Sequence, residues 1–202
     1  MKKVVVITTG GTIAMKYDAD ACGLIPTVGG EDLTNAVPEL KEFAEVEVVE
    51  FTNIPSGHMT PQLMLELSVL VDEIAGREDV EGLVVTHGTD TLEETAYFLS
   101  ITLQTHKPVC ITGAMRGASE AGCDGPANVL AAVRVAATGG AGKYGVVVVF
   151  DDEIHAAADV TKAHTTSCHT FQSPGWGPIG HVYFDTVLFK RGVEKAKTIE
   201  AK

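Results

Sequence analysis

The sequence lacks any apolar run that approaches the roughly 20 residues needed to cross a bilayer. It also lacks a basic cluster, because 15 Lys and Arg stand against 27 Asp and Glu, which gives a net charge of −12. A chain this acidic is poorly suited to bind a phosphate backbone or an anionic membrane. We therefore expect neither a nucleic acid nor a membrane as a partner.

The four cysteines lie far apart in the sequence and form no C-x-x-C pair. Free thiols in a reducing compartment are the simplest interpretation. The start of the chain also differs from a secretory signal, because the apolar run at residues 4–7 is too short and leads directly into a Thr- and Gly-rich segment. Both features predict a cytoplasmic location.

Several motifs of catalytic or nucleotide-binding proteins are absent. The sequence has no G-x-x-x-x-G-K-[ST] and no G-x-S-x-G, and the loop after the first strand does not carry G-x-G-x-x-G, so Gly10-Gly11 is a weak candidate for a nucleotide loop. A zinc site is the next alternative, since His164, Cys168 and His169 lie close together with His155 nearby, but their spacing fits no standard zinc pattern. We interpret these histidines as polar residues of a surface segment, and we expect no metal and no cofactor.

What the sequence does contain is an alternation of short apolar runs with helical segments. The apolar runs are rich in Val and Ile, as is typical of parallel strands covered on both faces. The expected strands are residues 4–8, 46–52, 82–86, 108–112 and 145–150. This order predicts an α/β fold of three layers around a doubly wound, mostly parallel sheet of the flavodoxin or Rossmann kind.

Helix starts lie between these strands. Thr60-Pro61 is typical of a capped helix start, residues 91–94 resemble a capping box, and Asp124 can cap a helix over residues 126–137. Residues 31–37 and 38–44 resemble a short helical pair.

The pattern changes after residue 150. Residues 151–180 are rich in Gly, Thr and His without a long apolar run, and residues 181–191 alternate like a hairpin arm or an edge strand. Residues 192–202 are charged. We therefore expect one α/β domain over residues 1–191, ending in an edge hairpin or strand, and then a linker or frayed tail over residues 192–202.

In an open α/β sheet, ligands bind beyond the carboxyl ends of the strands. Thr12 would lie just past the first strand, and Thr89 with Asp90 just past the third. A threonine hydroxyl becomes a nucleophile only when a base takes its proton, and Lys162 could complete a relay of hydroxyl, amine and carboxylate. A structural alternative stays open, because threonines at strand ends often cap the next helix and lysines are usually solvated.

Two segments carry a family likeness. Residues 7–14 (Ile-Thr-Thr-Gly-Gly-Thr-Ile-Ala) resemble the first signature of bacterial-type L-asparaginases, and residues 86–96 (Thr-His-Gly-Thr-Asp-Thr-Leu-Glu-Glu-Thr-Ala) resemble the second. Residues 112–116, 124–126 and 159–162 match the same family in order and spacing. The likeness runs from about residue 3 to residue 191, so the chain resembles the N-terminal domain of the asparaginase/glutaminase family.

The resemblance implies hydrolysis of the side-chain amide of L-asparagine to L-aspartate and ammonia through a threonine acyl-enzyme, with L-glutamine usually a weaker substrate. It implies no cofactor and no metal. It also implies that Thr12 is the nucleophile and Thr89 the second catalytic threonine, with Asp90 and Lys162 completing the relay. The implied substrate-binding positions are Gly11, Ser56, Gly57, Gly88, Thr89, Asp90 and Ala114.

The sequence departs from the family pattern in three places. Gly57 stands where a glutamine that reaches the substrate α-amino group is common. The usual lid tyrosine is absent from residues 22–29, so Tyr17 is the catalytic candidate to close over Thr12, with an exposed loop aromatic as the alternative. The family's second α/β domain, which adds polar groups to the pocket and builds much of the oligomer interface, does not follow within these 202 residues. From the family we expect a homodimer or a homotetramer.

Two other functions stay open. A truncated domain could fold and bind Asp or Asn with little or no catalytic activity, as the missing second domain and Gly57 suggest. An amidotransferase-type glutaminase that works on aminoacyl-tRNA is the other, although the acidic charge and the lack of an RNA-binding extension count against it.

Overall fold

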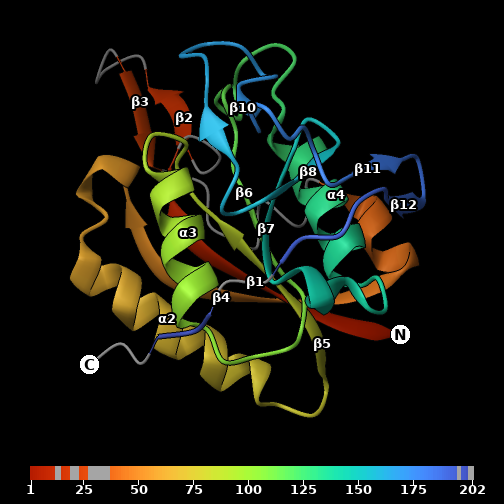
Figure 1. Ribbon diagram of the computed structural model, residues 1–202. Coiled ribbons are helices and arrows are strands. Elements are labelled where there is room, and N and C mark those ends of the chain that lie inside the picture. The colour runs from red at the N-terminus through yellow and green to blue at the C-terminus, as the bar shows by residue number, and fades with distance from the viewer. Residues whose placement is uncertain (12–14, 19–22, 27–36, 195–196, 200–202) are drawn as a thin grey trace.

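The computed structural model describes residues 1–11, 15–18, 23–26, 37–194 and 197–199. In that part of the chain an eight-stranded sheet lies between helices on both of its faces (Figure 1). Its parallel part consists of β1 (Lys2–Gly10), β4 (Ala44–Ile54), β5 (Val80–Thr86), β6 (Val109–Thr112) and β7 (Val146–Phe150). These strands coincide with the five predicted apolar runs, so the predicted α/β fold is confirmed.

The order of these strands defines where a ligand can bind. Along the sheet they lie in the order β7-β6-β5-β1-β4. The chain therefore starts in the middle, adds β4 on one side and then builds outward on the other, as in flavodoxin-type doubly wound sheets. Ligands of such sheets bind where the order reverses, which is between β1 and β5. The loops after Gly10 and Thr86 therefore flank the expected binding site.

The two faces of the sheet pack against different helices. These are α2 (Pro61–Ala75), α3 (Leu92–Thr102) and α4 (Gly125–Ala136), with the 3-10 helices η2 (Pro38–Glu42), η3 (Ser56–His58) and η4 (Ala141–Tyr144). Val4 and Val6 of β1 pack into the core shared with α4 and η2, whereas Val5 and Ile7 pack into the core shared with α2 and α3. All four side chains are fully buried, which is why β1 has no polar alternation.

The start of α2 is formed as predicted, because the Thr60 hydroxyl accepts a hydrogen bond from the N–H of Leu63 at 3.3 Å. The helical pair expected over residues 31–44 is only partly described. Residues 31–36 lie outside the described residues, and η2 ends at Glu42 because the chain already enters β4 at Ala44.

The other two helices begin where predicted, but their predicted caps are wrong. The hydroxyl of Thr91 does not cap α3; it donates to the carbonyl of Ser56 at 2.7 Å. Asp124 does not cap α4; its carboxylate accepts the N–H groups of residues 115–116 at 2.9–3.2 Å. In both cases the polar side chain stabilises a neighbouring loop instead of the helix end.

Beyond β7 the chain reverses direction. Asp151 and Asp152 have positive φ angles of 50° and 60°, and β8 (Glu153–Ala156) then pairs antiparallel with β7. Nothing in the sequence predicts β8, because a left-handed turn at two non-glycine residues is uncommon. The hairpin of β11 (Gly180–Tyr183) and β12 (Thr186–Phe189) forms the edge of the sheet, which confirms the predicted edge hairpin.

Two small two-stranded sheets lie apart from the main sheet. One pairs β2 (Met15–Asp18) with β3 (Gly23–Pro26), and the other pairs β9 (Thr161–Lys162) with β10 (Phe171–Gln172). The β2–β3 hairpin and β10 both lie at the top of the molecule in Figure 1. The linker or tail expected from residue 192 stays a prediction. No helix among the described residues is long and apolar enough to cross a membrane.

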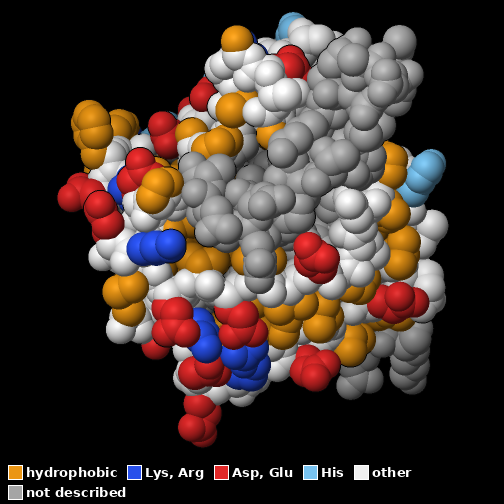
Figure 2. Space-filling view, turned by 180° about the vertical axis from the view of Figure 1, so that it is seen from behind, with side chains coloured by type: hydrophobic (Ala, Val, Ile, Leu, Met, Phe, Trp, Pro, Cys, Tyr) orange, Lys and Arg blue, Asp and Glu red, His pale blue; other side chains and the backbone are white. Residues whose placement is uncertain are grey.

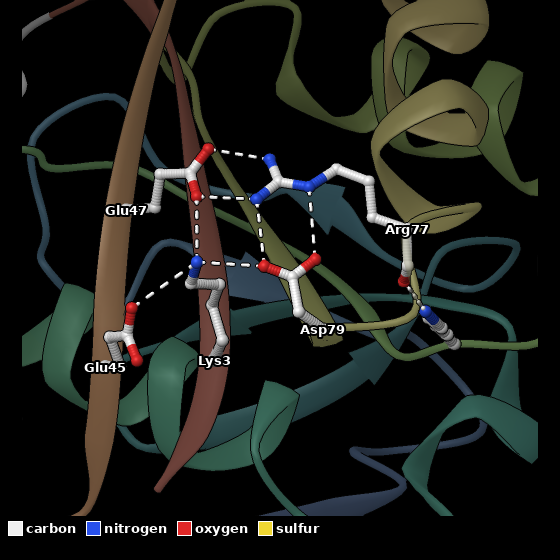
Figure 3. Close-up of polar contacts among 6 residues, drawn as sticks. Lys3, Glu45, Glu47, Arg77 and Asp79 are labelled. Atoms are coloured by element: carbon white, nitrogen blue, oxygen red, sulfur yellow. Dashed lines mark hydrogen bonds and ion pairs between the residues drawn. The ribbon is translucent and has the colours of Figure 1, made fainter.

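Charged side chains form a cluster near the amino ends of β1, β4 and β5 (Figure 3). Arg77 donates to both carboxylate oxygens of Glu47 at 2.7 Å, and Asp79 lies 3.2 Å from Arg77 and 2.9 Å from the amine of Lys3. Glu45 completes the cluster, 3.3 Å from Lys3. On the face seen in Figure 2, the Lys and Arg side chains at the lower edge likewise lie among Asp and Glu side chains. The two cations of the cluster are thus matched by three carboxylates.

An Asp79→Asn variant should lower the melting temperature by a few degrees at pH 7. Hydrogen bonds from Arg77 and then from Lys3 lower the pKa of Asp79 to about 2, below its usual value of 3.8. A lowered carboxyl pKa stabilises the fold above the unfolded value and loses this effect as the pH falls toward the folded value. The difference in melting temperature from wild type should therefore shrink between pH 4 and pH 2.

High salt should shrink this difference as well, because the cluster is exposed to solvent. The exposed neighbour Glu78 provides the matched control, since Glu78→Gln removes the same charge outside the cluster. Equal effects of the two variants would contradict a stabilising role for the cluster.

Candidate active site

Thr89, Asp90 and Lys162 meet at the carboxyl edge of the sheet. The amine of Lys162 donates to the Thr89 hydroxyl at 2.8 Å and to Oδ1 of Asp90 at 2.7 Å. Thr89 is buried, the side chain of Lys162 is 16% exposed, and that of Asp90 is 78% exposed. The hydroxyl, the amine and the carboxylate of the expected relay are therefore in contact, and one end of the relay is open to solvent. Their catalytic roles stay a prediction.

Thr89 and Asp90 lie in the turn between β5 and α3, and this turn packs against η3. The N–H of Asp90 donates to the Ser56 hydroxyl at 3.2 Å, and the Thr91 hydroxyl donates to the Ser56 carbonyl. Ser56 is buried by these contacts. The loop after β4 is therefore fixed to the loop after β5, and the implied substrate-binding serine lies directly beside Asp90.

Glycines allow the loops after β1 and β5 to touch. Gly11 has a φ of +83°, and a Cβ added to it would lie 2.3 Å from the Cα of Gly88. A Cβ added to Gly88 would lie 2.8 Å from the side-chain oxygen of Ser56. Gly11, Gly88 and Ser56 thus pack in a row, and at Gly11 both the positive φ and the lack of space require glycine.

The other expected site residues are placed differently. The methyl group of Ala114 is buried in the core shared with α4, so only its main chain could face a ligand. Gly57 is exposed, and a Cβ there would meet no atom within 4 Å, so a longer side chain would find space. Thr12 lies outside the described residues, and so does the side chain of Tyr17, whose backbone belongs to β2.

His87 is a buried neighbour of the relay that was not among the predicted site residues. Its Nδ1 lies 2.7 Å from the Gly88 carbonyl, and its Nε2 lies 3.0 Å from the hydroxyl of Thr95. Burial lowers the pKa of His87, which favours the neutral ring. Since a carbonyl only accepts, Nδ1–H donates to Gly88 and the Thr95 hydroxyl donates to Nε2. The ring therefore holds the main chain at Gly88, next to Thr89.

Glu93 on α3 is a second polar neighbour that sequence reasoning missed. Its carboxylate accepts hydrogen bonds from the Thr161 hydroxyl at 3.0 Å and from the main-chain N–H of Lys162. The sequence signal at this position was interpreted as part of a capping box, which explains why its contact with β9 was not anticipated.

The histidine-rich segment does not converge on one point. His164 accepts N–H groups of the turn that follows it, and His169 lies 2.9 Å from Asp151. The expectation of a surface position is wrong for His155, which is only 1% exposed beside Ser173 because it lies on the unpredicted strand β8. Burial lowers the pKa of His155 to about 4. Among the residues that the structure describes, no three His, Cys, Asp or Glu side chains are placed to hold a metal ion.

The fold and this geometry define a doubly wound α/β protein in which Lys162 contacts Thr89 and Asp90 near the point where the strand order reverses. The family model described as Asparaginase, N-terminal, matches residues 3–195. The chain therefore belongs to the asparaginase family, with its similarity to the N-terminal domain.

Individual relatives agree with this assignment. The chain is 40% identical over 199 residues to L-asparaginase 2 of Bacillus subtilis. The aligned region covers 96% of this chain and 52% of that protein. The chain is also 40% identical over 205 residues to the glutaminase-asparaginase of Pseudomonas fluorescens. Here the aligned region covers 100% of this chain and 56% of that protein. The crystal structure of a probable cytoplasmic L-asparaginase from Campylobacter jejuni matches it with a TM-score of 0.89 and 35% identity, over 100% of this chain and 61% of that chain. The chain thus spans about half the length of its curated relatives.

Proposed function

We propose that this chain carries the amidohydrolase site of an L-asparaginase, which hydrolyses the side-chain amide of L-asparagine to L-aspartate and ammonia. The observation that carries the proposal is the contact of Lys162 with both Thr89 and Asp90. This contact lies near the place where the strand order of an asparaginase-family sheet reverses, between β1 and β5. The names of the relatives support the same reaction.

The proposed reaction proceeds in two steps. In the first, the hydroxyl oxygen of Thr12 attacks the amide carbon, and the C–N bond breaks to leave an ester and ammonia. In the second, water hydrolyses the ester and restores the threonine. Both steps need a group that takes a proton from a hydroxyl and returns it to the leaving group. We assign this transfer to Thr89 and Lys162, which are 2.8 Å apart.

The remaining groups of the site suit a free amino acid. Asp90 is largely exposed and uses Oδ1 for Lys162, which leaves Oδ2 for the α-ammonium group of a substrate. Main-chain N–H groups of the glycine loops are suited to stabilise the oxyanion that forms at the amide carbon. L-Glutamine is one methylene longer, and we propose that it is a weaker substrate of the same site.

The proposal predicts ammonia release from L-asparagine by the purified chain, reduced at least about 10³-fold by Thr12→Val. Valine has nearly the shape of threonine but no hydroxyl to form the ester. Ammonia should be measured with L-asparagine and with L-glutamine, on proteins whose folding is checked by circular dichroism. Unchanged activity in Thr12→Val would contradict the proposed nucleophile. A folded wild-type chain that binds aspartate by calorimetry but releases no ammonia would instead favour a binding domain.

We also propose that the chain assembles as a homodimer or a homotetramer and that it acts in the cytoplasm. The first follows from the family resemblance, and the second from the three cysteines that the structure describes, which are free, and from the similar Campylobacter jejuni protein, which is described as cytoplasmic. Light scattering coupled to size exclusion would measure the oligomeric state directly.

A further inference from the structure

We propose that Glu93 is a positioning residue that holds Lys162 against Thr89 and Asp90. The carboxylate of Glu93 accepts hydrogen bonds from two consecutive residues of β9, Thr161 through its hydroxyl and Lys162 through its main-chain N–H. The consequence for catalysis rests on the proposed function, whereas the effect on the position of Lys162 does not.

Lys162 is held at both ends by one short segment of the chain. Its side-chain amine is bonded to Thr89 and Asp90 in the turn before α3, and its main chain is bonded to Glu93 in the first turn of α3. The helix itself is fixed in the core, because Leu92 and the apolar residues that follow it on the same face are fully buried. The two anchors therefore keep a constant separation, and they define where the amine can lie.

This second anchor matters because the buried core reaches only Val160, just before β9, and neither residue of β9 itself is buried. The strand is two residues long, and it pairs with β10 rather than with the eight-stranded sheet. Phe171 fixes β10 in the core, with its ring centroid 4.9 Å from that of Phe150. A lysine side chain is long and flexible, so its amine is positioned accurately only when its main chain is fixed. Glu93 supplies a direct link between β9 and α3.

The contacts of Glu93 indicate hydrogen bonding rather than charge as the basis of its role. Within the described part of the chain, both groups that donate to Glu93 are uncharged, and neither is the ammonium group of Lys162. A glutamine of the same length can accept the Lys162 N–H through its oxygen and donate to the Thr161 hydroxyl through its nitrogen. An alanine can do neither. Glu93→Gln should therefore keep the hydrogen bonds that hold Lys162 in place, whereas Glu93→Ala should lose them.

The experiment compares Glu93→Ala, Glu93→Gln and Thr161→Val with wild type. The matched control is Glu94→Ala, which removes the exposed carboxylate next in sequence. The first readout needs no activity: limiting acetic anhydride labels amines, and peptide mass spectrometry gives the labelling rate of Lys162 relative to that of exposed Lys190. This ratio should rise several-fold in Glu93→Ala and stay within about twofold of wild type in Glu93→Gln and Glu94→Ala.

The second readout is ammonia release from L-asparagine. In Glu93→Ala, kcat should fall at least about tenfold while KM stays within about twofold, because a displaced amine impairs proton transfer without removing a substrate contact. Glu93→Gln should restore most of kcat, and Thr161→Val, which removes only one of the two hydrogen bonds, should lie between wild type and Glu93→Ala.

Each outcome separates this inference from the proposed function. Unchanged labelling and unchanged kcat in Glu93→Ala would overturn the positioning role, and so would a Glu93→Gln variant as impaired as Glu93→Ala. If Glu93→Ala does not fold, Thr161→Val decides, since wild-type labelling in that variant would also overturn the role. If even the wild type releases no ammonia, the proposed function fails, and the labelling ratio still tests Glu93.

Discussion

A Lys162→Met variant is expected to lose about 10²–10⁴-fold in kcat for ammonia release from L-asparagine, the usual contribution of a general acid–base group. Methionine preserves the unbranched apolar stem but cannot take up or return a proton. The Thr89 hydroxyl would lose the amine that lies 2.8 Å away, and Asp90 would lose its partner at 2.7 Å. KM should change much less than kcat, because the Asp90 carboxylate remains in place to bind a substrate ammonium group.

Steady-state kinetics with L-asparagine, together with a melting curve, would measure this effect. Lys190→Met is the matched control, because Lys190 is exposed at the end of β12 and far along the sheet from β5. The control should keep the wild-type kcat. A Lys162→Met variant with a normal kcat would contradict proton transfer by the amine and would leave Lys162 as a structural partner of Asp90.

A Gly11→Ala variant is expected to damage both the fold and the site. The positive φ of 83° alone should cost about 1–3 kcal/mol of unfolding free energy for a residue with a Cβ. The added methyl would also lie 2.3 Å from the Cα of Gly88, so the loops after β1 and β5 must move apart. A displacement of about 1 Å at a reacting group costs on the order of 10²-fold in rate, and kcat should fall accordingly.

Chemical denaturation and ammonia release would test the two effects separately. Gly139→Ala provides the control, because a Cβ at this exposed glycine would meet no atom within 4 Å. It should leave both the stability and kcat near wild type. Wild-type activity in Gly11→Ala would show that the close approach of the two loops is not needed for the reaction.

The parallel part of the fold was predictable because each central strand is buried on both faces and is therefore apolar throughout. Val4 to Ile7 illustrate this, since alternate side chains enter opposite cores. The strand β8 was not predictable, because it depends on a left-handed turn at Asp151 and Asp152 that the residue types do not demand. The helix caps failed for a related reason: Thr91 and Asp124 can bond to any donor or acceptor nearby, and in the folded chain loop groups are closer.

The residues of the candidate site likewise fall into those that the sequence could predict and those that it could not. The topology of parallel strands directs Thr89 and Asp90 to one edge in advance, whereas Lys162, which follows no parallel strand, could be added to them only as a nearby lysine and through the family resemblance. The contact of Glu93 with β9 could not, since it joins residues that lie 68 and 69 positions apart and depends on where a two-residue strand settles. His87 was hidden for another reason, because a buried histidine beside a strand end has the same sequence context as an exposed one.

The small sheet of β9 and β10 has a practical consequence for protein engineering. Lys162 is carried by a unit whose strand pairing is separate from the eight-stranded sheet. Mutant libraries confined to residues 161–172 can therefore alter the approach of the amine to its partners while the main scaffold keeps its hydrogen bonds. Within such a library, Phe171 should stay apolar, because its ring anchors the unit to the core.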